Sequence, residues 1–320
     1  MNMDAHFVFP VLISFAVSAI LGPFVITFLR NLKMRQTERE DGVKAHLKKA
    51  GTPTMGGVIF LAGILVTSVF YIPGHPRIVP VLILTLGFGA IGFIDDYLKV
   101  ILHRSDGLLA WQKLLLQIVV TAVFAFWMVK INHIDLSMIV PFAGGKTINI
   151  GIFSIPLIFF AVIGTVNGTN FTDGLDGLAS TVTLVVAAFF TAVSLVKGAG
   201  LEPISAAVCG GLMGFLLYNA YPAKIFMGDT GSLALGGFAA GMAYMMQMPL
   251  FILLVGLIYL VEVLSVMLQV SYFKATHGKR IFKMAPIHHH FELCGWSETR
   301  IVTVFSIVTT VMCLIAFAAM

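Results

Sequence analysis

The sequence predicts an all-α polytopic membrane protein: a single domain over residues 1–320, with about ten transmembrane helices, both termini outside and a small extracytoplasmic β-hairpin. Hydrophobic residues make up 58% of the chain and charged residues only 11%, whereas soluble domains carry about 25% charged residues. Apolar stretches free of Asp, Glu, Lys and Arg recur along the chain, and Lys and Arg concentrate in alternate connections between them.

We expect these apolar stretches to form ten spans. Several are shorter than the roughly 20 residues of a straight crossing, so their ends must extend into flanking residues. The ninth contains one charge, Glu262. Pro10, Pro23 and Pro156 are expected as tolerable kinks within the bundle. The first span has no basic residue before it, so we expect no cleavable signal peptide. The spans are Phe7–Leu29, Met55–Ile72, Ile78–Ile94, Leu114–Val129, Ile152–Val166, Gly177–Val196, Pro203–Tyr218, Gly231–Met248, Leu250–Phe273 and Ile301–Ala319.

The orientation follows from the basic residues. Of the 20 Lys and Arg residues, all but Arg77, Lys130, Lys146 and Lys197 lie in connections that follow odd-numbered spans. Cytoplasmic loops carry the excess of Lys and Arg, so these connections are expected inside and both termini outside. The same bias explains the net charge of +5, and no nucleic-acid partner is needed.

The outer connections are short, except for residues 131–150. Polar and apolar residues alternate there around Phe142-Ala-Gly-Gly-Lys146, which predicts a small surface β-hairpin. The three cysteines, Cys209, Cys294 and Cys313, have no spacing that indicates a disulfide framework or a zinc site. Every dense polar motif falls on the inner side.

Asp95 and Asp96 end the third span and belong at the water interface, because a charge at the bilayer centre costs about 3 kcal/mol. Two like charges about 4 Å apart repel by roughly 4 kcal/mol at an effective dielectric near 20. A divalent cation or a shared proton would relieve that repulsion, and carboxylates are the usual protein ligands of magnesium. The alternative is a pair that only caps a helix end in water.

The first two inner connections supply cations. Lys48 and Lys49 come just before the start of the second helix, where free backbone N–H groups attract anions. Lys113 opens the fourth helix, within reach of an anion bound near Asp95. The alternatives are ordinary positive-inside charge and, for Lys113, an anchor that extends to the interface.

The next two inner connections carry acids. Asn170, Asp173 and Asp176 recur every third residue, so a helical turn would place them on one face. Asp229 is flanked by glycines at the start of a helix, where a carboxylate can bring magnesium beside phosphate oxygens. A plain turn and a plain N-cap are the respective alternatives.

The last inner motifs lie near the C-terminus. Glu262, Ser265 and Gln269 form a polar stripe on the ninth helix. His288, His289 and His290 follow Pro286 and basic residues, which suggests phosphate binding or proton handling. No ligand spacing supports zinc.

The chain resembles the polyprenyl-phosphate N-acetylhexosamine-1-phosphate transferase superfamily, and within it the bacterial phospho-N-acetylmuramoyl-pentapeptide transferase family. Five stretches carry the resemblance, in order and on one side of the membrane. They are Gly51-Thr-Pro-Thr-Met-Gly-Gly57, Phe93-Ile-Asp-Asp-Tyr97, Asn170-Phe-Thr-Asp-Gly-Leu-Asp-Gly-Leu178, Pro222-Ala-Lys-Ile-Phe-Met-Gly-Asp-Thr-Gly-Ser232 and Pro286-Ile-His-His-His290.

The resemblance implies a multi-pass enzyme of the bacterial plasma membrane, commonly a homodimer, with a cytoplasmic active site. Its reaction joins UDP-N-acetylmuramoyl-pentapeptide to undecaprenyl phosphate with Mg²⁺, giving lipid I and UMP. The residues that match catalytic positions are Asp95, Asp96, Asp229 and His288, with Asp229 as the metal ligand. Those that match substrate-binding positions are Lys48, Lys113, Asn170, Asp173, Asp176, Asn219, Phe226, Gln269, His289 and His290.

The residues favour direct attack by the lipid phosphate, which is largely dianionic at neutral pH and hardly needs a strong base. A covalent aspartyl intermediate is the alternative. The same chemistry on UDP-N-acetylglucosamine is a second enzymatic possibility. A transporter is a remote one, because Glu262 is the one acid within a predicted span.

Overall fold

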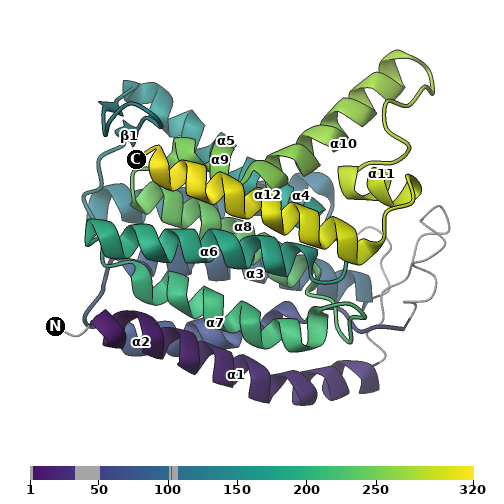
Figure 1. The fold of residues 1–320 in the computed structure, drawn as a ribbon, viewed down its shortest axis with the longest axis horizontal. Helices are drawn as coiled ribbons and strands as arrows, with labels where there is room; N and C mark the ends of the chain where they lie inside the picture. The colour runs from purple at the N-terminus through teal and green to yellow at the C-terminus, as the bar shows by residue number, and fades with distance from the viewer. Residues whose placement is uncertain (1–2, 33–50, 101, 103–106) are drawn as a thin grey trace.

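The computed structural model describes residues 3–32, 51–100, 102 and 107–320, which are almost entirely helical. Its long helices lie side by side in one elongated bundle (Figure 1). The α-helices are α1 (Met3–Asn31), α2 (Gly57–Tyr71), α3 (Ile78–Val100), α4 (Ala110–Phe126), α5 (Ser154–Thr172), α6 (Leu178–Lys197), α7 (Glu202–Asn219), α8 (Gly228–Met245), α9 (Ile252–Val255), α10 (Leu257–Ala275), α11 (Ile287–Leu293) and α12 (Glu298–Ala318). Short π- and 3₁₀-helical segments are η2 (Trp127–Ile131), η3 (Gly151–Phe153) and η4 (Pro249–Phe251), and the strands are β1 (Met138–Ile139) and β2 (Thr147–Ile148).

Nine of the ten predicted spans each overlap one α-helix. Within the described part of the chain, seven helices are long and apolar enough to cross a membrane, and α2 is a shorter apolar helix of 15 residues. The predicted ninth span is not continuous, because Gly256 separates α9 from α10. Pro156 is not a mid-helix kink: it lies in the first turn of α5, where its missing N–H costs no intrahelical hydrogen bond.

Helix α8 is the centre of the bundle. All its residues from Thr230 to Met245 are buried, and it packs against α3 and α5. Glycines permit a close approach: Gly92 of α3 lies directly against the backbone carbonyl of Asp229, and a Cβ at Gly236 would lie 2.5 Å from Cα of Val166 in α5. The polar ends of α3 and α5 therefore converge on the first turn of α8.

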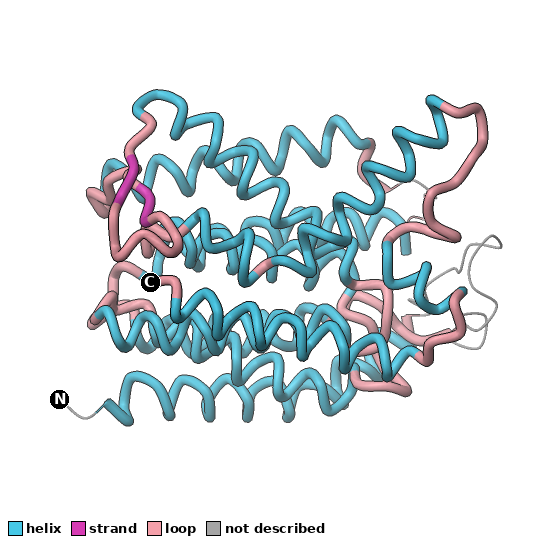
Figure 2. The backbone as a smooth tube through the Cα atoms, turned by 45° about the horizontal axis from the view of Figure 1, so that its top comes forward, coloured by secondary structure: helices cyan, strands magenta, loops and turns pink. Residues whose placement is uncertain are grey.

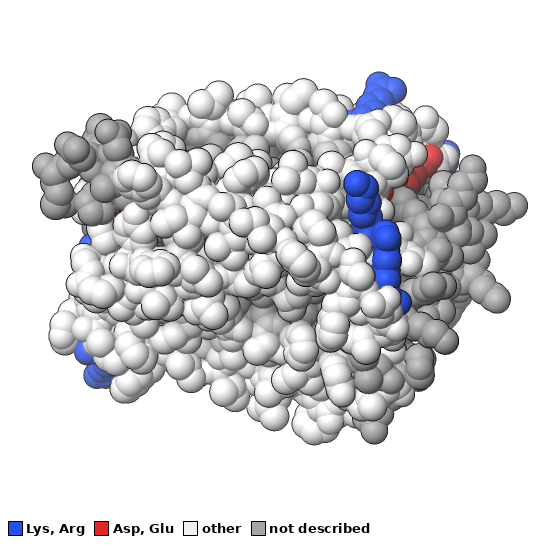
Figure 3. All heavy atoms as spheres, turned by 90° about the horizontal axis from the view of Figure 1, so that it is seen from below, with Lys and Arg blue, Asp and Glu red and all other residues white. Residues whose placement is uncertain are grey.

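The two ends of the bundle differ. Both termini lie at the same end as the β-hairpin, and α11 lies at the other (Figures 1 and 2). Met138 pairs with Ile148 in antiparallel register, which confirms the predicted hairpin. Between the ends, outer helices expose apolar side chains such as Phe24, Phe70 and Phe160, and the face in Figure 3 carries almost no charge across its middle. Such a surface suits a lipid environment.

Candidate active site

Asp95 lies at the C-terminal end of α3 and is almost completely buried. Its Oδ2 accepts hydrogen bonds from Nζ of Lys99 at 2.9 Å and from Nζ of Lys113 at 3.1 Å. Its Oδ1 accepts one from the backbone N–H of Leu108 at 2.7 Å. Both carboxylate oxygens are thus held, by donors from α3, from the α3–α4 connection and from α4.

The same two ammonium groups bind Asp229 in the first turn of α8. Oδ2 of Asp229 lies 3.0 Å from Nζ of Lys99 and 2.9 Å from Nζ of Lys113. Burial alone would raise the pKa of the Asp229 carboxyl, but the ammonium charges of Lys113 and Lys99 and the hydrogen bond from Asn170 hold that pKa well below its usual range. Asp229 is therefore ionised, and it shares two cations with Asp95.

Asp96 points to the other side of the same turn and binds the start of α8. Its Oδ1 accepts from the backbone N–H of Asp229 at 3.2 Å. Its Oδ2 accepts from the backbone N–H of Thr230 at 2.9 Å and from Oγ1 of Thr230 at 2.6 Å. Adjacent residues of α3 thus have different partners.

Helix α5 adds an amide and a further acid. Nδ2 of Asn170 donates to Oδ1 of Asp229 and to Oγ of Ser232, each at 2.8 Å. Asp173 follows the end of α5, and burial raises the pKa of its carboxyl well above its ordinary value. The nearby charges of Asp229, Asp96 and Asp176 raise it further.

This arrangement fits a divalent cation in its donor chemistry. Carboxylate and amide oxygens are the ligands magnesium prefers, and a cation would relieve the mutual repulsion of these acids. No three His, Cys, Asp or Glu side chains among the described residues form a ready-made metal site. A magnesium ion bound here would therefore need oxygens from a phosphate or from water to complete its shell.

Two predicted site residues hold loops together. Oδ2 of Asp176 accepts from the backbone N–H of Ala223 at 2.8 Å, and its own N–H donates to Oε1 of Glu298 at 2.6 Å. Asn219 is buried, accepts from Oγ of Ser180 at 2.7 Å and donates to the carbonyl of Ile225 at 3.0 Å. Both side chains are buried, and both hold the connection between α7 and α8 at the charged end of the bundle.

The histidine segment, His288–His290, contacts the site at Gly174. Nδ1 of His288 lies 3.0 Å from Oε1 of the fully buried Glu262. Its Nε2 lies directly against Gly174, next to Asp173, and finds no hydrogen-bond partner among the described residues. The ring of His289 packs against that of His288 at a tilt of 59°, with 4.1 Å between ring centroids, and its Nδ1 lies 2.7 Å from Oε2 of Glu292.

Gln269 and His290 organise the connection between α10 and α11. Oε1 of Gln269 accepts from the N–H groups of Ile281 and Phe282, and its Nε2 donates to the carbonyl of Phe282. Nδ1 of His290 accepts from the N–H of Lys283 at 3.1 Å. In this arrangement both side chains are engaged with the backbone of that loop.

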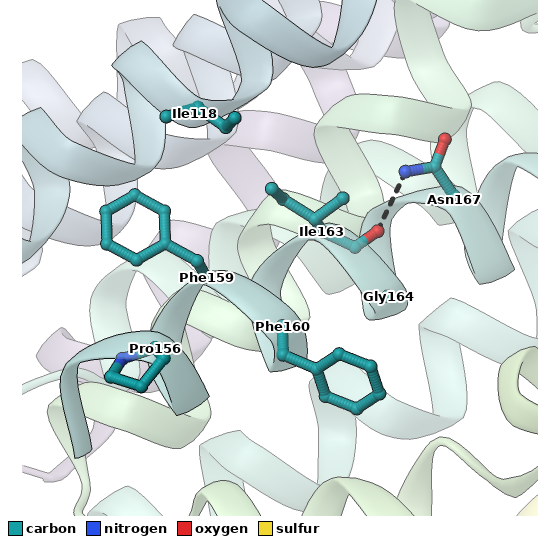
Figure 4. Close-up of a pocket in the computed structure, with 7 residues that line it drawn as sticks. All are labelled: Ile118, Pro156, Phe159, Phe160, Ile163, Gly164 and Asn167. Carbon is teal, nitrogen blue, oxygen red and sulfur yellow. Dashed lines mark hydrogen bonds between the residues drawn. The ribbon is translucent and has the colours of Figure 1, made fainter. Parts of the chain in front are cut away.

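An apolar groove runs between α4 and α5. It has a volume of roughly 600 Å³, and it is lined by Ile118, Pro156, Phe159, Phe160, Ile163, Gly164 and Asn167 (Figure 4). Asn167 is its polar end: its Nδ2 donates to the carbonyl of Ile163 at 2.8 Å and to Oε1 of Gln117 at 3.1 Å. Asn167 lies one turn before Asn170, and Gln117 one turn after Lys113, so the groove leads toward the charged cluster.

Known proteins resemble this chain over its whole length. The family described as Glycosyl transferase family 4 matches residues 78–247, and the signature described as Phospho-N-acetylmuramoyl-pentapeptide-transferase signature 1 matches residues 49–61. A protein of Acetivibrio thermocellus named phospho-N-acetylmuramoyl-pentapeptide-transferase is 51% identical over 100% of this chain and 96% of its own. Proteins of the same name from Clostridium perfringens strain 13 and Clostridium botulinum strain Eklund 17B are 49% and 51% identical, covering 99% and 97% of this chain and 100% and 95% of theirs.

The chain belongs to the phospho-N-acetylmuramoyl-pentapeptide transferase family. The family's signature segment packs against the start of α8: Phe226 donates its N–H to the carbonyl of Pro53 and accepts from the N–H of Gly56. Phe226 therefore holds this segment through its backbone. Lys48 lies outside the described residues, so its predicted role stays a prediction.

Three members of the cluster were absent from the residues singled out in the sequence. Lys99 lies four residues after Asp95 on α3, so helical spacing alone could have identified it. Thr230 and Ser232 follow Asp229 in the stretch that carries the family resemblance. Their roles depend on which neighbours α8 meets, and no local pattern shows that.

Proposed function

We propose that this protein transfers phospho-N-acetylmuramoyl-pentapeptide from UDP-N-acetylmuramoyl-pentapeptide to undecaprenyl phosphate, giving lipid I and UMP. The observation that supports this most strongly is the convergence of Asp95, Asp229, Lys99 and Lys113 at one end of the bundle, in a chain about half identical to proteins of that name. Two ammonium groups beside an apolar groove suit an anionic nucleotide and a phosphate attached to a lipid.

The bond changes are those of a single displacement. An oxygen of the lipid phosphate attacks the sugar-linked phosphorus of the nucleotide. A new P–O bond forms as the bond to the bridging oxygen breaks, and UMP leaves with that electron pair. Phosphoryl transfer depends mostly on positioning and charge neutralisation. Lys99 and Lys113 are placed to neutralise the diphosphate.

Direct attack agrees with the hydrogen bonding of the acids. Both oxygens of Asp95 and both oxygens of Asp96 already accept hydrogen bonds, so neither offers a free nucleophile. The acceptor phosphate needs no strong base, because it is largely dianionic at neutral pH. Exchange of labelled UMP into the nucleotide sugar without any lipid acceptor would contradict direct attack.

Magnesium would be held by Asp229, with Asn170 and Asp173 beside it. When bound, the ion would neutralise charge on the diphosphate. Asn170 keeps the Asp229 carboxylate oriented through its bond at 2.8 Å. The electrostatic support for this site is the raised pKa of Asp173 among neighbouring acids.

The polyprenyl chain of the acceptor would lie in the groove between α4 and α5. The groove is apolar and open, and Phe159 and Phe160 supply aromatic surface for an isoprenoid chain (Figure 4). Its Asn167 end would place the lipid phosphate near Lys113, at the end of α4 that also meets Asp95 and Asp229.

The proposed reaction needs the charged end of the bundle in the cytoplasm of a bacterial cell. We infer that the chain crosses the plasma membrane ten times with both termini outside, supported by the distribution of Lys and Arg and by termini that share the hairpin end (Figure 2). The homodimer implied by the family resemblance stays a prediction.

Turnover by the purified protein in detergent tests the proposal. With undecaprenyl phosphate and magnesium, UDP-N-acetylmuramoyl-pentapeptide should give lipid I and stoichiometric UMP, and UDP-N-acetylglucosamine should give neither. Turnover of UDP-N-acetylglucosamine alone would replace this substrate assignment with the related transferase activity. No UMP from either nucleotide would contradict the proposed enzyme class.

A further inference from the structure

The start of α8 receives its cap from a different helix. A helix begins with backbone N–H groups that have no partner within it, and a side chain just before the helix usually accepts from them. The residue at that position is Met227, which makes no such hydrogen bond. Asp96 of α3 takes this role, because it accepts from the N–H groups of Asp229 and Thr230.

The Asp96 carboxylate is surrounded closely by donors and by backbone. The Thr230 hydroxyl adds a third donor at 2.6 Å, and the Asp96 side chain is almost fully buried. Gly228 has a φ of +70°, and a Cβ there would lie 2.6 Å from Oδ2 of Asp96. Only glycine tolerates both that conformation and that contact. Neither Lys99 nor Lys113 is among the described hydrogen-bond partners of Asp96, whereas both bind its neighbour Asp95.

We propose that Asp96 is a positioning residue: it caps α8 and thereby fixes the Asp229 carboxylate, and it does not itself attack the substrate. An acidic group at a helix N-terminus also interacts favourably with the helix dipole. Asp229 is then held on two sides, by Asp96 through its backbone and by Asn170 through its side chain. This inference rests on the proposed function, because it assigns a role within that site.

The matched pair Thr230→Val and Thr230→Ser separates the two roles. Removing the hydroxyl loosens the cap, so Thr230→Val should lower kcat about tenfold and raise the magnesium concentration that gives the half-maximal rate. Thr230→Ser keeps the hydroxyl and should stay within about twofold of the wild type. A reacting carboxylate would instead lose only one of its three donors in Thr230→Val, and its Oδ2 would keep the backbone N–H of Thr230, so kcat should not fall. Wild-type kcat in that variant would overturn the proposal, as would a mass-spectrometric adduct trapped on Asp96.

Amide hydrogen exchange supplies a readout that needs no substrate. In Thr230→Val the first-turn amides of α8 should exchange faster than in the wild type, while those of α6 should not change. Unchanged exchange at α8 would overturn the cap. Asp96→Asn is a poor test. The new NH₂ group would face N–H donors from which it cannot accept, so the variant enzyme would lose activity whether Asp96 positions α8 or reacts. If the wild type turned over neither nucleotide, the proposed function would fail, but the exchange experiment would still test the cap.

Discussion

A buried carboxylate lies near each end of the bundle, but the two surroundings differ. Near the hairpin end, Glu202 accepts from Oγ of Ser194 at 2.8 Å and lies 3.9 Å from Nδ1 of His75, so it links the α2–α3 and α6–α7 turns. At the end opposite the hairpin, here called the loop end, Asp95 and Asp229 share Lys99 and Lys113, and Asp96 and Asp173 lie close to Asp229. One acid with neutral or titratable partners stabilises a turn, whereas several acids around fewer ammonium groups leave negative charge for a bound cation.

Removal of magnesium should have the largest effect at the loop end. Chelation should reduce turnover to background, and added magnesium should restore it. Because a ligand that binds only the folded state stabilises it, magnesium should also raise the melting temperature of the wild type. The same addition should leave the melting temperature of Asp229→Asn unchanged. An equal rise in both proteins would show that the ion binds elsewhere.

Asp229→Asn should come next. The change removes the charge shared by both lysines and leaves two ammonium groups with Asp95 alone. Lipid I formation should fall by about a thousandfold, measured with radiolabelled nucleotide sugar. The variant should keep its helical circular dichroism and its place in the membrane fraction. Near-normal turnover would remove Asp229 from the site.

Lys113→Met should lower kcat/KM by about a hundredfold, because one of two cations is lost at the proposed diphosphate site. Lys113→Arg keeps the charge and serves as the matched control, with a smaller loss caused by its different geometry. Steady-state kinetics with varied concentrations of the nucleotide sugar measure this change in kcat/KM. If both variants were equally impaired, the shape of Lys113 rather than its charge would matter.

Glu202→Gln should have the smallest effect on activity. Turnover should stay within about twofold of the wild type, while stability falls by about 1 kcal/mol from the weakened turn. Thermal unfolding and turnover of the same preparation measure both. A loss of turnover as large as that of Lys113→Met would show that the hairpin end also serves the reaction, and that Glu202 does more than stabilise a turn.

Much of the fold was predictable because hydropathy and charge belong to single segments. Nine of the ten predicted spans each overlap one α-helix, and the hairpin falls within residues 131–150. The break at Gly256 was missed because η4, α9 and α10 are all apolar, and apolarity does not distinguish one helix from two. The loop acids were identified as a group because several motifs follow spans that end on the same side.

Individual roles were less predictable. Asn219 and Asp176 are expected at the substrate, and that role stays a prediction; the structure adds hydrogen bonds by which both hold loops together. The expected role of Gln269 beside the nucleotide likewise stays a prediction, and its side chain binds the backbone of residues 281 and 282. An amide or a carboxylate suits either task, so residue type alone cannot separate them.

The sequence by itself determined that this protein is a helical membrane protein with its chemistry on one side, and it carried the motifs of a transferase family. Only the tertiary structure decided which atoms meet. Asp229 and Asn170 are 59 residues apart, and Asp96 and Thr230 are 134 apart. Their contacts exist because Gly92 allows α3 to lie directly on α8, and the distance between helices depends on packing over the whole bundle.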